Sequence, residues 1–105
     1  LQGAFLATEI QIWKTKEFIQ WFEKQSKKTK VMIDARLDRI AYFEHFGTTK
    51  RFDDLIELKW KAGLRIYCYQ VDLKNLIILL GGTKNGQQYD ISQAKKILNQ
   101  ITETA

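Results

Sequence analysis

Three cationic residues in separate stretches of the chain are candidates for a phosphate-binding site. Lys59 lies in LIELKWK, Arg65 in LRIYCYQV and Lys84 in LLGGTKNG. If the first two stretches are paired strands, the register that keeps one face apolar places Lys59 directly opposite Arg65. Opposed like charges cost about 0.2–1 kcal/mol, and a bound anion would relieve that cost. Fixed cations are also the groups that stabilise negative charge on a reacting phosphate.

The glycines before Lys84 extend the same argument. Pairing the strands across the DLKN turn brings Arg65 alongside Gly81, so that Lys84 joins the other two cations at one end of the sheet. We expect Gly81 and Gly82 to leave room for a ligand's backbone, because they carry no side chains. GGTKNG is not a Walker A loop, since its lysine falls between the glycines, and nucleoside triphosphate binding is therefore not expected. A solvated basic face is the alternative that the residues leave open.

Other reactive residue types have simpler explanations. Cys68 lies in an apolar strand pattern and is expected to be an inert buried thiol, and His45 is expected at the end of a helix. No Ser/His/Asp or Cys/His set can be built around either residue. Tyr67, Tyr69 and Tyr89 could stack on bases, which is a weak signal by itself.

Two carboxylates one helical turn apart, Asp34 and Asp38, could imitate a metal-binding pair. Arg36 and Arg39 are interleaved with them, so we expect a solvent-exposed face held by salt bridges instead. A single cysteine can form neither an internal disulfide nor a cysteine-based metal site. We therefore expect no metal and no other cofactor.

The composition limits the class of protein. A chain of 105 residues with 45% hydrophobic residues can form one domain with its own core. The net charge of +5 favours a polyanionic partner, such as RNA, DNA, the ribosome surface or an acidic protein, although excess lysine also serves solubility. No signal peptide or membrane span is evident, so we expect a cytoplasmic protein without a membrane partner. Residues 1–7 are interpreted as a disordered or cloning-derived end.

Hydrophobic periodicity predicts the elements that position these residues. They are a strand over 8–13, helices over 15–28 (with Thr15 as N-cap) and 30–45, strands over 55–61, 64–71 and 76–80, and a helix from Ile91 onward. Within 55–61, alternation places Glu57, Lys59 and Lys61 on the face opposite the apolar one. The predicted fold class is α+β: a small antiparallel β-sheet packed by an N-terminal helical hairpin and a C-terminal helix, with the helices on one face.

Three segments together resemble a known family. ELKWKAGLRIYCYQV, LIILLGGTKNGQQYDISQAKKIL and RLDRI are similar to bacterial toxins of the RelE/HigB/ParE superfamily, above all to the phage-derived Gp49-like branch of addiction-module killer proteins. That branch shows an E-L-[RK] strand, a G-x-R-[IV]-x-Y strand and a GG-x-K-x-x-Q-x-x-DI-x-x-A segment. The likeness covers roughly residues 10–101. It implies that residues 1–105 form one toxin domain. It implies the fold outlined above and cleavage of messenger RNA, usually in the ribosomal A site.

The resemblance also implies roles for individual residues. Arg65 matches the arginine that clamps the scissile phosphate, Lys59 the basic residue of the neighbouring strand, and Lys84 the cation of the loop after the last strand. Gln87 is the glutamine of that loop, and Tyr89 lies near a tyrosine that some relatives use in proton transfer. The substrate-binding residues then include Gly81, Gly82, Gln87, Tyr67 and Lys61.

Glu57 departs from RelE itself, which has a lysine at this position, although glutamate is usual in the Gp49-like branch. The identity of the general base is therefore left open: the candidates are Glu57, Tyr89 and a lysine with a lowered pKa. RNA carries its own nucleophile, the 2′-hydroxyl, so positioned cations can promote its attack on the phosphate without a metal.

The resulting prediction is the toxin of a type II toxin–antitoxin system that acts as an mRNA endoribonuclease, most often on the ribosome. The expected partner is an antitoxin, a helix-turn-helix protein through which the toxin meets DNA only indirectly. One alternative is a ParE-like toxin that inhibits gyrase, and the cationic loop argues against it, because a gyrase binder needs no phosphate clamp. A non-catalytic prophage remnant is the other alternative.

Overall fold

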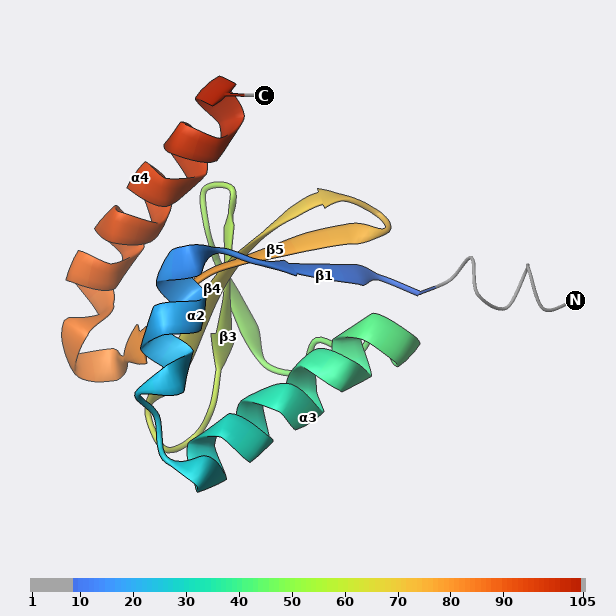
Figure 1. Ribbon diagram of the computed structural model, residues 1–105, viewed down its shortest axis with the longest axis vertical. Helices are drawn as coiled ribbons and strands as arrows, with labels where there is room; N and C mark the ends of the chain where they lie inside the picture. Colours follow the sequence, from blue (N-terminus) through green and yellow to red (C-terminus); the bar gives the residue numbers. More distant parts are fainter. Residues whose placement is uncertain (1–8, 105) are drawn as a thin grey trace, which may run out of the picture.

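A mixed five-stranded sheet forms the middle layer of the fold (Figure 1). The structure is a computed structural model and describes residues 9–104, so the expectation for residues 1–7 lies outside the described residues. The strand order is β1-β5-β4-β3-β2, and β1 is parallel to β5 whereas the other neighbours are antiparallel. The strands are β1 (Gln11–Lys14), β2 (Thr49–Phe52), β3 (Leu55–Lys59), β4 (Leu64–Asp72) and β5 (Asn75–Thr83).

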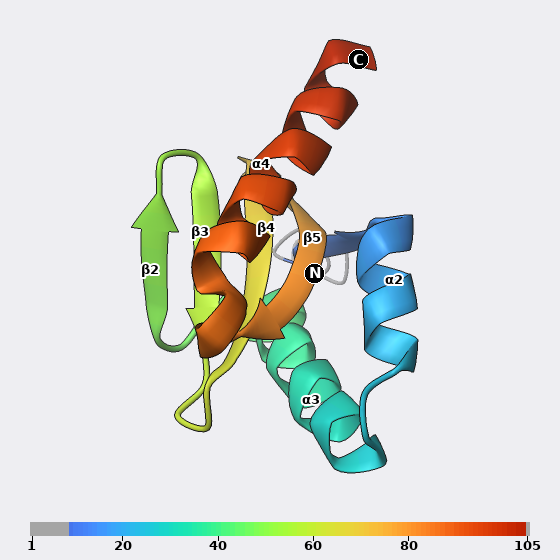
Figure 2. The same ribbon diagram turned by 90° about the vertical axis from the view of Figure 1, so that its left-hand side faces the viewer.

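Helices cover both faces of this sheet (Figures 1 and 2). The N-terminal pair, α2 (Lys16–Glu23) and α3 (Lys27–Phe43), packs on one face, and α4 (Gln87–Thr104) follows the short 3-10 helix η1 (Lys84–Gly86) and packs on the other. The fold class is as predicted, but the expectation that all helices lie on one face is wrong. The reason is that both sets of alternating positions in the central strands carry apolar side chains, so each face needs its own cover.

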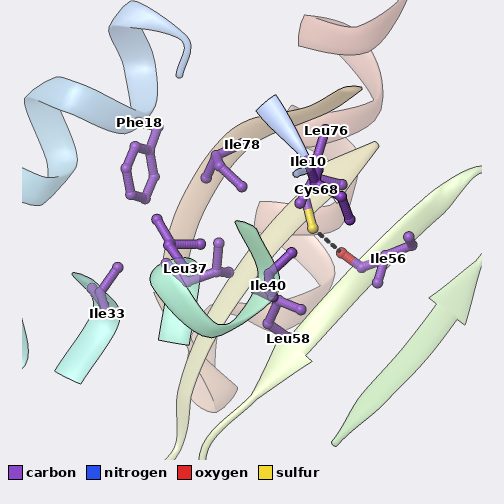
Figure 3. Close-up of a cluster of buried hydrophobic side chains, with 11 residues drawn as sticks. Ile10, Phe18, Ile33, Leu37, Ile40, Ile56, Leu58, Cys68, Leu76 and Ile78 are labelled. Carbon is purple, nitrogen blue, oxygen red and sulfur yellow. Dashed lines mark hydrogen bonds between the residues drawn. The ribbon is translucent and has the colours of Figure 1, made fainter. Parts of the chain in front are cut away.

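Each face has its own hydrophobic core. Figure 3 shows the larger one, in which Phe18 of α2 and Ile33, Leu37 and Ile40 of α3 lie over Leu58 and its neighbours on the sheet. The other core joins α4 to the second face through Leu55, Tyr67, Leu79, Ala94, Ile97 and Leu98. The position of α4 matters for the site, because its first turn covers the sheet end where the predicted cations lie.

Caps set the boundaries of the helical hairpin. Thr15 Oγ1 accepts a 3.0 Å hydrogen bond from Phe18 N and donates a 2.7 Å bond to Leu79 O, so the predicted N-cap also ties α2 to β5. Ser26 Oγ accepts from Thr29 N at 3.1 Å and starts α3. The hairpin is confirmed, and its joint at 24–26 lies within the polar stretch KQSKKT that indicates it. The first helix ends earlier than predicted, at Glu23, and the second begins earlier, at Lys27, because Ser26 is a stronger N-cap signal than the lysines around it.

Two further boundaries differ from the sequence prediction. β2 was not predicted, because its residues, TKRF, are mostly exposed and show no apolar alternation. The C-terminal helix starts at Gln87 instead of Ile91, and β5 continues through the glycines to Thr83. Of the described residues, no helix combines the length and apolar character that crossing a membrane requires.

The predicted register between β3 and β4 is confirmed: Leu58 pairs with Ile66, and Lys59 pairs with Arg65. Between β4 and β5 the register shifts by one residue, since Tyr67 pairs with Leu80 whereas Cys68 pairs with Ile78. Leu79 is thus the extra residue of a β-bulge. Two rows of neighbouring residues result, Lys59–Arg65–Gly82 and Glu57–Tyr67–Leu80. Arg65 therefore lies beside Gly82, not beside Gly81 as predicted.

Candidate active site

Glu57 is a fully buried carboxylate in the middle of the sheet. Its Oε2 accepts a 2.7 Å hydrogen bond from Gln87 Nε2, and its Oε1 lies 3.8 Å from Arg65 Nε. The predicted polar face is thus not open to solvent at this position, because the first turn of α4 covers it. A buried carboxylate requires such partners, since an unpaired charge in the interior is costly.

Arg65 is fixed at the end of β4 by contacts on two sides. Its Nη1 donates 3.0 Å hydrogen bonds to the carbonyls of Trp60 and Leu64, and its Nε faces Glu57. The side chain is 13% exposed, and Nη2 donates to no residue within 9–104. The guanidinium is therefore held in one orientation with one nitrogen left for an external acceptor.

Lys84 lies against the turn that joins β3 and β4. Its backbone N donates a 2.8 Å hydrogen bond to Gly63 O, and its aliphatic stem follows Gly63, where an added Cβ would be 3.4 Å from Lys84 Cγ. Lys59 and Arg65 pair at the ends of the two strands next to this turn, and Lys61 is exposed within it. The structure thus brings the four cations to the same end of the sheet.

Both glycines of β5 have a different role from the one that the sequence predicts. They are buried, and a Cβ on Gly81 would collide with the ring of Trp21, whereas a Cβ on Gly82 would collide with the carboxylate of Asp90. The missing side chains leave room for the chain's own groups, so the expected space for RNA at these two residues is not present. Glycine is required here by close packing of α2 and α4 on β5.

Tyr67 is also corrected as a substrate-binding residue. Its ring is fully buried in the core under α4, and it cannot stack on a base. Burial, and after it the Glu57 carboxylate, raises the pKa of the Tyr67 hydroxyl well above its usual range. Tyr89, by contrast, is 69% exposed on the first turn of α4. Gln87, another expected substrate-binding residue, donates its hydrogen bond to the buried Glu57 carboxylate instead of facing outward.

Arg36 is a buried residue that sequence reasoning placed on the surface. Its Nε, Nη1 and Nη2 donate to the carbonyls of Phe46, Lys59 and Thr48 at 2.9, 2.5 and 2.6 Å, and its guanidinium stacks 4.3 Å from the Trp60 ring centre. Burial lowers the pKa of this guanidinium. Arg36 therefore joins α3 to the strand end that carries Lys59, and the predicted surface salt bridges to Asp34 and Asp38 are not formed between the described residues.

Asp90 was also missed. It lies on the first turn of α4 with Oδ2 against Gly82, beside the row that contains Lys59 and Arg65. Partial burial raises the pKa of its carboxyl group. The only sequence signal for it was its place in the aspartate–isoleucine pair of the family pattern.

Cys68 is the inert buried thiol that was expected. Its Sγ donates a 3.4 Å hydrogen bond to Ile56 O (Figure 3), and burial raises its pKa to about 12. His45 is exposed just beyond the end of α3. Across residues 9–104, no three acidic, histidine or cysteine side chains gather in a way that could hold a metal ion.

Comparison with known proteins relates this geometry to relatives. No protein-family model matches the chain. An uncharacterized protein of Haemophilus influenzae is 36% identical over 99 residues, which cover 88% of this chain and 96% of that protein.

Solved structures share the fold at low identity. A mutant of the Escherichia coli toxin RelE in the free state aligns with a TM-score of 0.69 and 14% identity, covering 84% of this chain and 96% of that chain. The intact E. coli RelBE toxin–antitoxin complex gives a TM-score of 0.55 at 12% identity, over 71% of this chain and 95% of that chain. The RelBE2 toxin–antitoxin complex of Mycobacterium tuberculosis aligns with a TM-score of 0.52 at 10% identity, over 71% of this chain and 98% of that chain.

Proposed function

This chain belongs to one family with the Haemophilus influenzae protein and has the fold of the toxin RelE, and from this premise we propose that it is the toxin of a type II toxin–antitoxin pair. In this role it cuts messenger RNA in the cytoplasm, with the ribosome presenting the message. The E-L-K strand and the glycine–lysine–glutamine segment support the Gp49-like branch as its place among such toxins.

The observation that carries the proposal is the fixed guanidinium of Arg65. Two main-chain carbonyls and the Glu57 carboxylate orient it, and Nη2 is left to bind an acceptor from outside. A bidentate or pre-oriented arginine binds a phosphate at little entropic cost, because the side chain is already ordered. Lys59 beside it and Lys84 on the adjoining turn add positive charge at the same end of the sheet.

These cations suit strand scission by the RNA itself. The 2′-hydroxyl attacks the adjacent phosphorus, and negative charge accumulates on the phosphoryl oxygens in the transition state. Pre-oriented cations stabilise that charge more than the charge of the ground state, which is the condition for catalysis. Arg65 would hold the scissile phosphate, while Lys59 and Lys84 would attract and align the RNA backbone on either side.

An antitoxin partner is part of the proposal, because two of the related folds were solved in toxin–antitoxin complexes. A groove of about 610 Å³ runs between β1, the start of α2 and the C-terminal half of α4. Trp13, Val71 and Ile97 line it together with Lys14 and Lys16. An apolar and acidic segment of the antitoxin, a helix-turn-helix protein that would also mediate contact with DNA, fits this combination. Co-purification from the native operon is the direct test.

Cleavage itself is tested with purified protein in a translation extract. We expect primer extension to reveal cuts within translated messages for the wild type and their loss, by about 100-fold or more, for Arg65→Ala. Lys74→Ala is the matched control, because Lys74 is an exposed cation in the β4–β5 turn at the opposite end of β5 from Lys84. It should cut at close to the wild-type rate.

A gyrase-supercoiling assay separates the main alternative. Inhibition of supercoiling without any RNA cleavage would replace the ribonuclease by a ParE-like gyrase toxin. Growth arrest that is equally strong for wild type and Arg65→Ala, with intact messages, would also contradict the ribonuclease proposal. Absence of any growth arrest without the antitoxin would indicate an inactive remnant.

A further inference from the structure

The proposed cleavage needs a group that takes the proton from the 2′-hydroxyl, and this inference rests on that proposed function. Glu57 is unsuited to the task, because it is fully buried and its two oxygens face Gln87 and Arg65. Tyr67 is equally enclosed, and its raised pKa keeps the hydroxyl protonated. Both residues are therefore out of reach of the substrate, and only Glu57 supports the arginine.

Asp90 is placed differently. Its Oδ2 lies so close to Gly82 that a Cβ there would collide with it, and Gly82 is the cross-strand neighbour of Arg65. The carboxylate thus takes the place of a side chain at the third position of the row that begins with Lys59 and Arg65. A phosphate held by Arg65 would have this carboxylate next to it.

The carboxylate of Asp90 is also free to accept a proton or a hydrogen bond. It forms no hydrogen bond and no ion pair with any residue in 9–104, although it is partly buried. It lines a hollow of about 400 Å³ between α2 and α4, together with Trp21, Leu80 and Tyr89. The Asp90 carboxylate is therefore open to this hollow on the side of α2.

We propose that Asp90 is the general base that deprotonates the attacking 2′-hydroxyl of the RNA. The proton passes from the 2′-oxygen to Asp90 Oδ1, the carboxylate oxygen that is not packed against Gly82. A bond forms between the 2′-oxygen and phosphorus, and the bond from phosphorus to the 5′-oxygen breaks. The departing 5′-oxygen takes a proton from water, and Asp90 later returns its proton to water. The products are a 2′,3′-cyclic phosphate and a 5′-hydroxyl end. Partial burial makes the carboxylate more basic than usual, which favours this transfer.

A simpler explanation is that Asp90 only stabilises the N-terminus of α4, where a negative charge is favourable. Asp90→Asn separates the two, because the amide keeps the shape and removes the base. We expect its cleavage rate at saturating RNA to fall by about 100-fold or more, with unchanged RNA binding. Glu103→Gln is the matched control, since Glu103 is an exposed carboxylate near the far end of the same helix, and it should cut like the wild type.

The pH profile adds a readout that a structural role would not move. The wild-type rate should rise with pH as Asp90 ionises and then level off, and Asp90→Asn should lack this rise. The titratable groups near Asp90 are Tyr67 of β4, which interacts with it electrostatically, and Glu17 of α2 and Lys96 of α4, which line the same hollow. Glu57 and Arg65 lie beyond Tyr67 and also act on its hydroxyl. Glu17→Gln, which removes the other carboxylate of the hollow, should keep the rise of the cleavage rate with pH. That result would assign this acid limb of the profile to Asp90 instead of Glu17.

Asp90→Ala with added acetate covers the case in which the asparagine variant folds poorly. A free carboxylate can enter the space that the alanine leaves, so acetate should restore part of the cleavage while chloride at equal ionic strength should not. The inference is overturned if Asp90→Asn cuts within about threefold of the wild type with the acid limb intact, or if acetate gives no rescue of folded Asp90→Ala. If the wild type itself cuts no RNA, the proposed function fails first. If the wild type cuts and Arg65→Ala does not, only the role of Asp90 is in question.

Discussion

Glu57 Oε1 lies 3.8 Å from Arg65 Nε, on diagonal positions of the neighbouring strands β3 and β4. Arg65 pairs directly with Lys59, so the buried carboxylate compensates within the protein for part of the repulsion between these two cations. A bound anion is then not the only relief for that repulsion. The arrangement instead leaves Arg65 ordered, with half-buried Lys59 beside it and exposed Lys84 on the adjoining turn.

Replacement of Glu57 should therefore affect both stability and cleavage. We expect Glu57→Ala to lower the free energy of unfolding by about 3–5 kcal/mol, because it leaves Arg65 and Gln87 without their buried partner. Urea unfolding measures this loss, and cleavage should fall with it as Arg65 becomes mobile. Glu103→Ala, an exposed change near the end of α4, is the control and should cost less than about 0.5 kcal/mol. Equal costs for the two variants would contradict the anchoring role of Glu57.

The pairing of Lys59 with Arg65 could be predicted because it depends on local alternation. The strands 55–61 and 64–71 each have one apolar face, and only some pairing registers place both apolar faces on the same side of the sheet. The short turn between the strands limits the choice of register further. The bulge at Leu79 could not be predicted in this way, because no local pattern marks it. In the structure the Leu79 carbonyl accepts a hydrogen bond from Thr15, in a distant part of the chain. That single shift moves Arg65 from Gly81 to Gly82.

The surroundings of the cations escaped prediction for a related reason. A glutamate between cationic positions has the pattern of a solvent-facing strand residue, and only the docking of α4 shows that Glu57 is buried. Arg36 likewise has the spacing of an exposed helical residue, yet it bonds to the carbonyls of Phe46 and Thr48, in a loop whose path no local pattern fixes, and to that of Lys59 at the end of β3. The close packing of Asp90 on Gly82 is a contact between elements and leaves no periodic trace.

Arg36 should be more important for stability than its neighbour Arg39. Arg36→Lys removes the planar donor set and the stacking on Trp60, so we expect a loss of about 2–4 kcal/mol of unfolding free energy. Arg39→Lys on the exposed side of the same helix should change it by less than about 0.5 kcal/mol. Thermal and urea unfolding of both proteins would measure the difference. Similar stability for the two variants would mean that the three carbonyls find other donors.

Gly82→Ala tests whether the glycines serve packing or RNA binding. The added methyl group collides with the Asp90 carboxylate, and we expect the shift of α4 to cost about 1–3 kcal/mol. Gly86→Ala is the control, because its Cβ would stay 3.2 Å from the same oxygen and requires only a small adjustment. Calorimetry gives the melting temperatures, and a binding assay with single-stranded RNA gives the affinity. A stable Gly82→Ala variant with weakened RNA binding would restore the role that the sequence predicts for this residue.

Asp90 should be a residue that reduces stability at neutral pH. Burial raises its pKa in the folded state above the unfolded value, so folding favours the protonated carboxyl. That contribution is fully present below the unfolded pKa of about 3.9 and is lost as the pH rises through the folded pKa. Asp90→Asn stays neutral at every pH, and its melting temperature should therefore exceed that of the wild type at pH 7. The difference should shrink as the pH falls toward about 3.5. Calorimetry across this range measures it, and a variant that is less stable than the wild type at pH 7 would instead mean that Asp90 supports the start of α4.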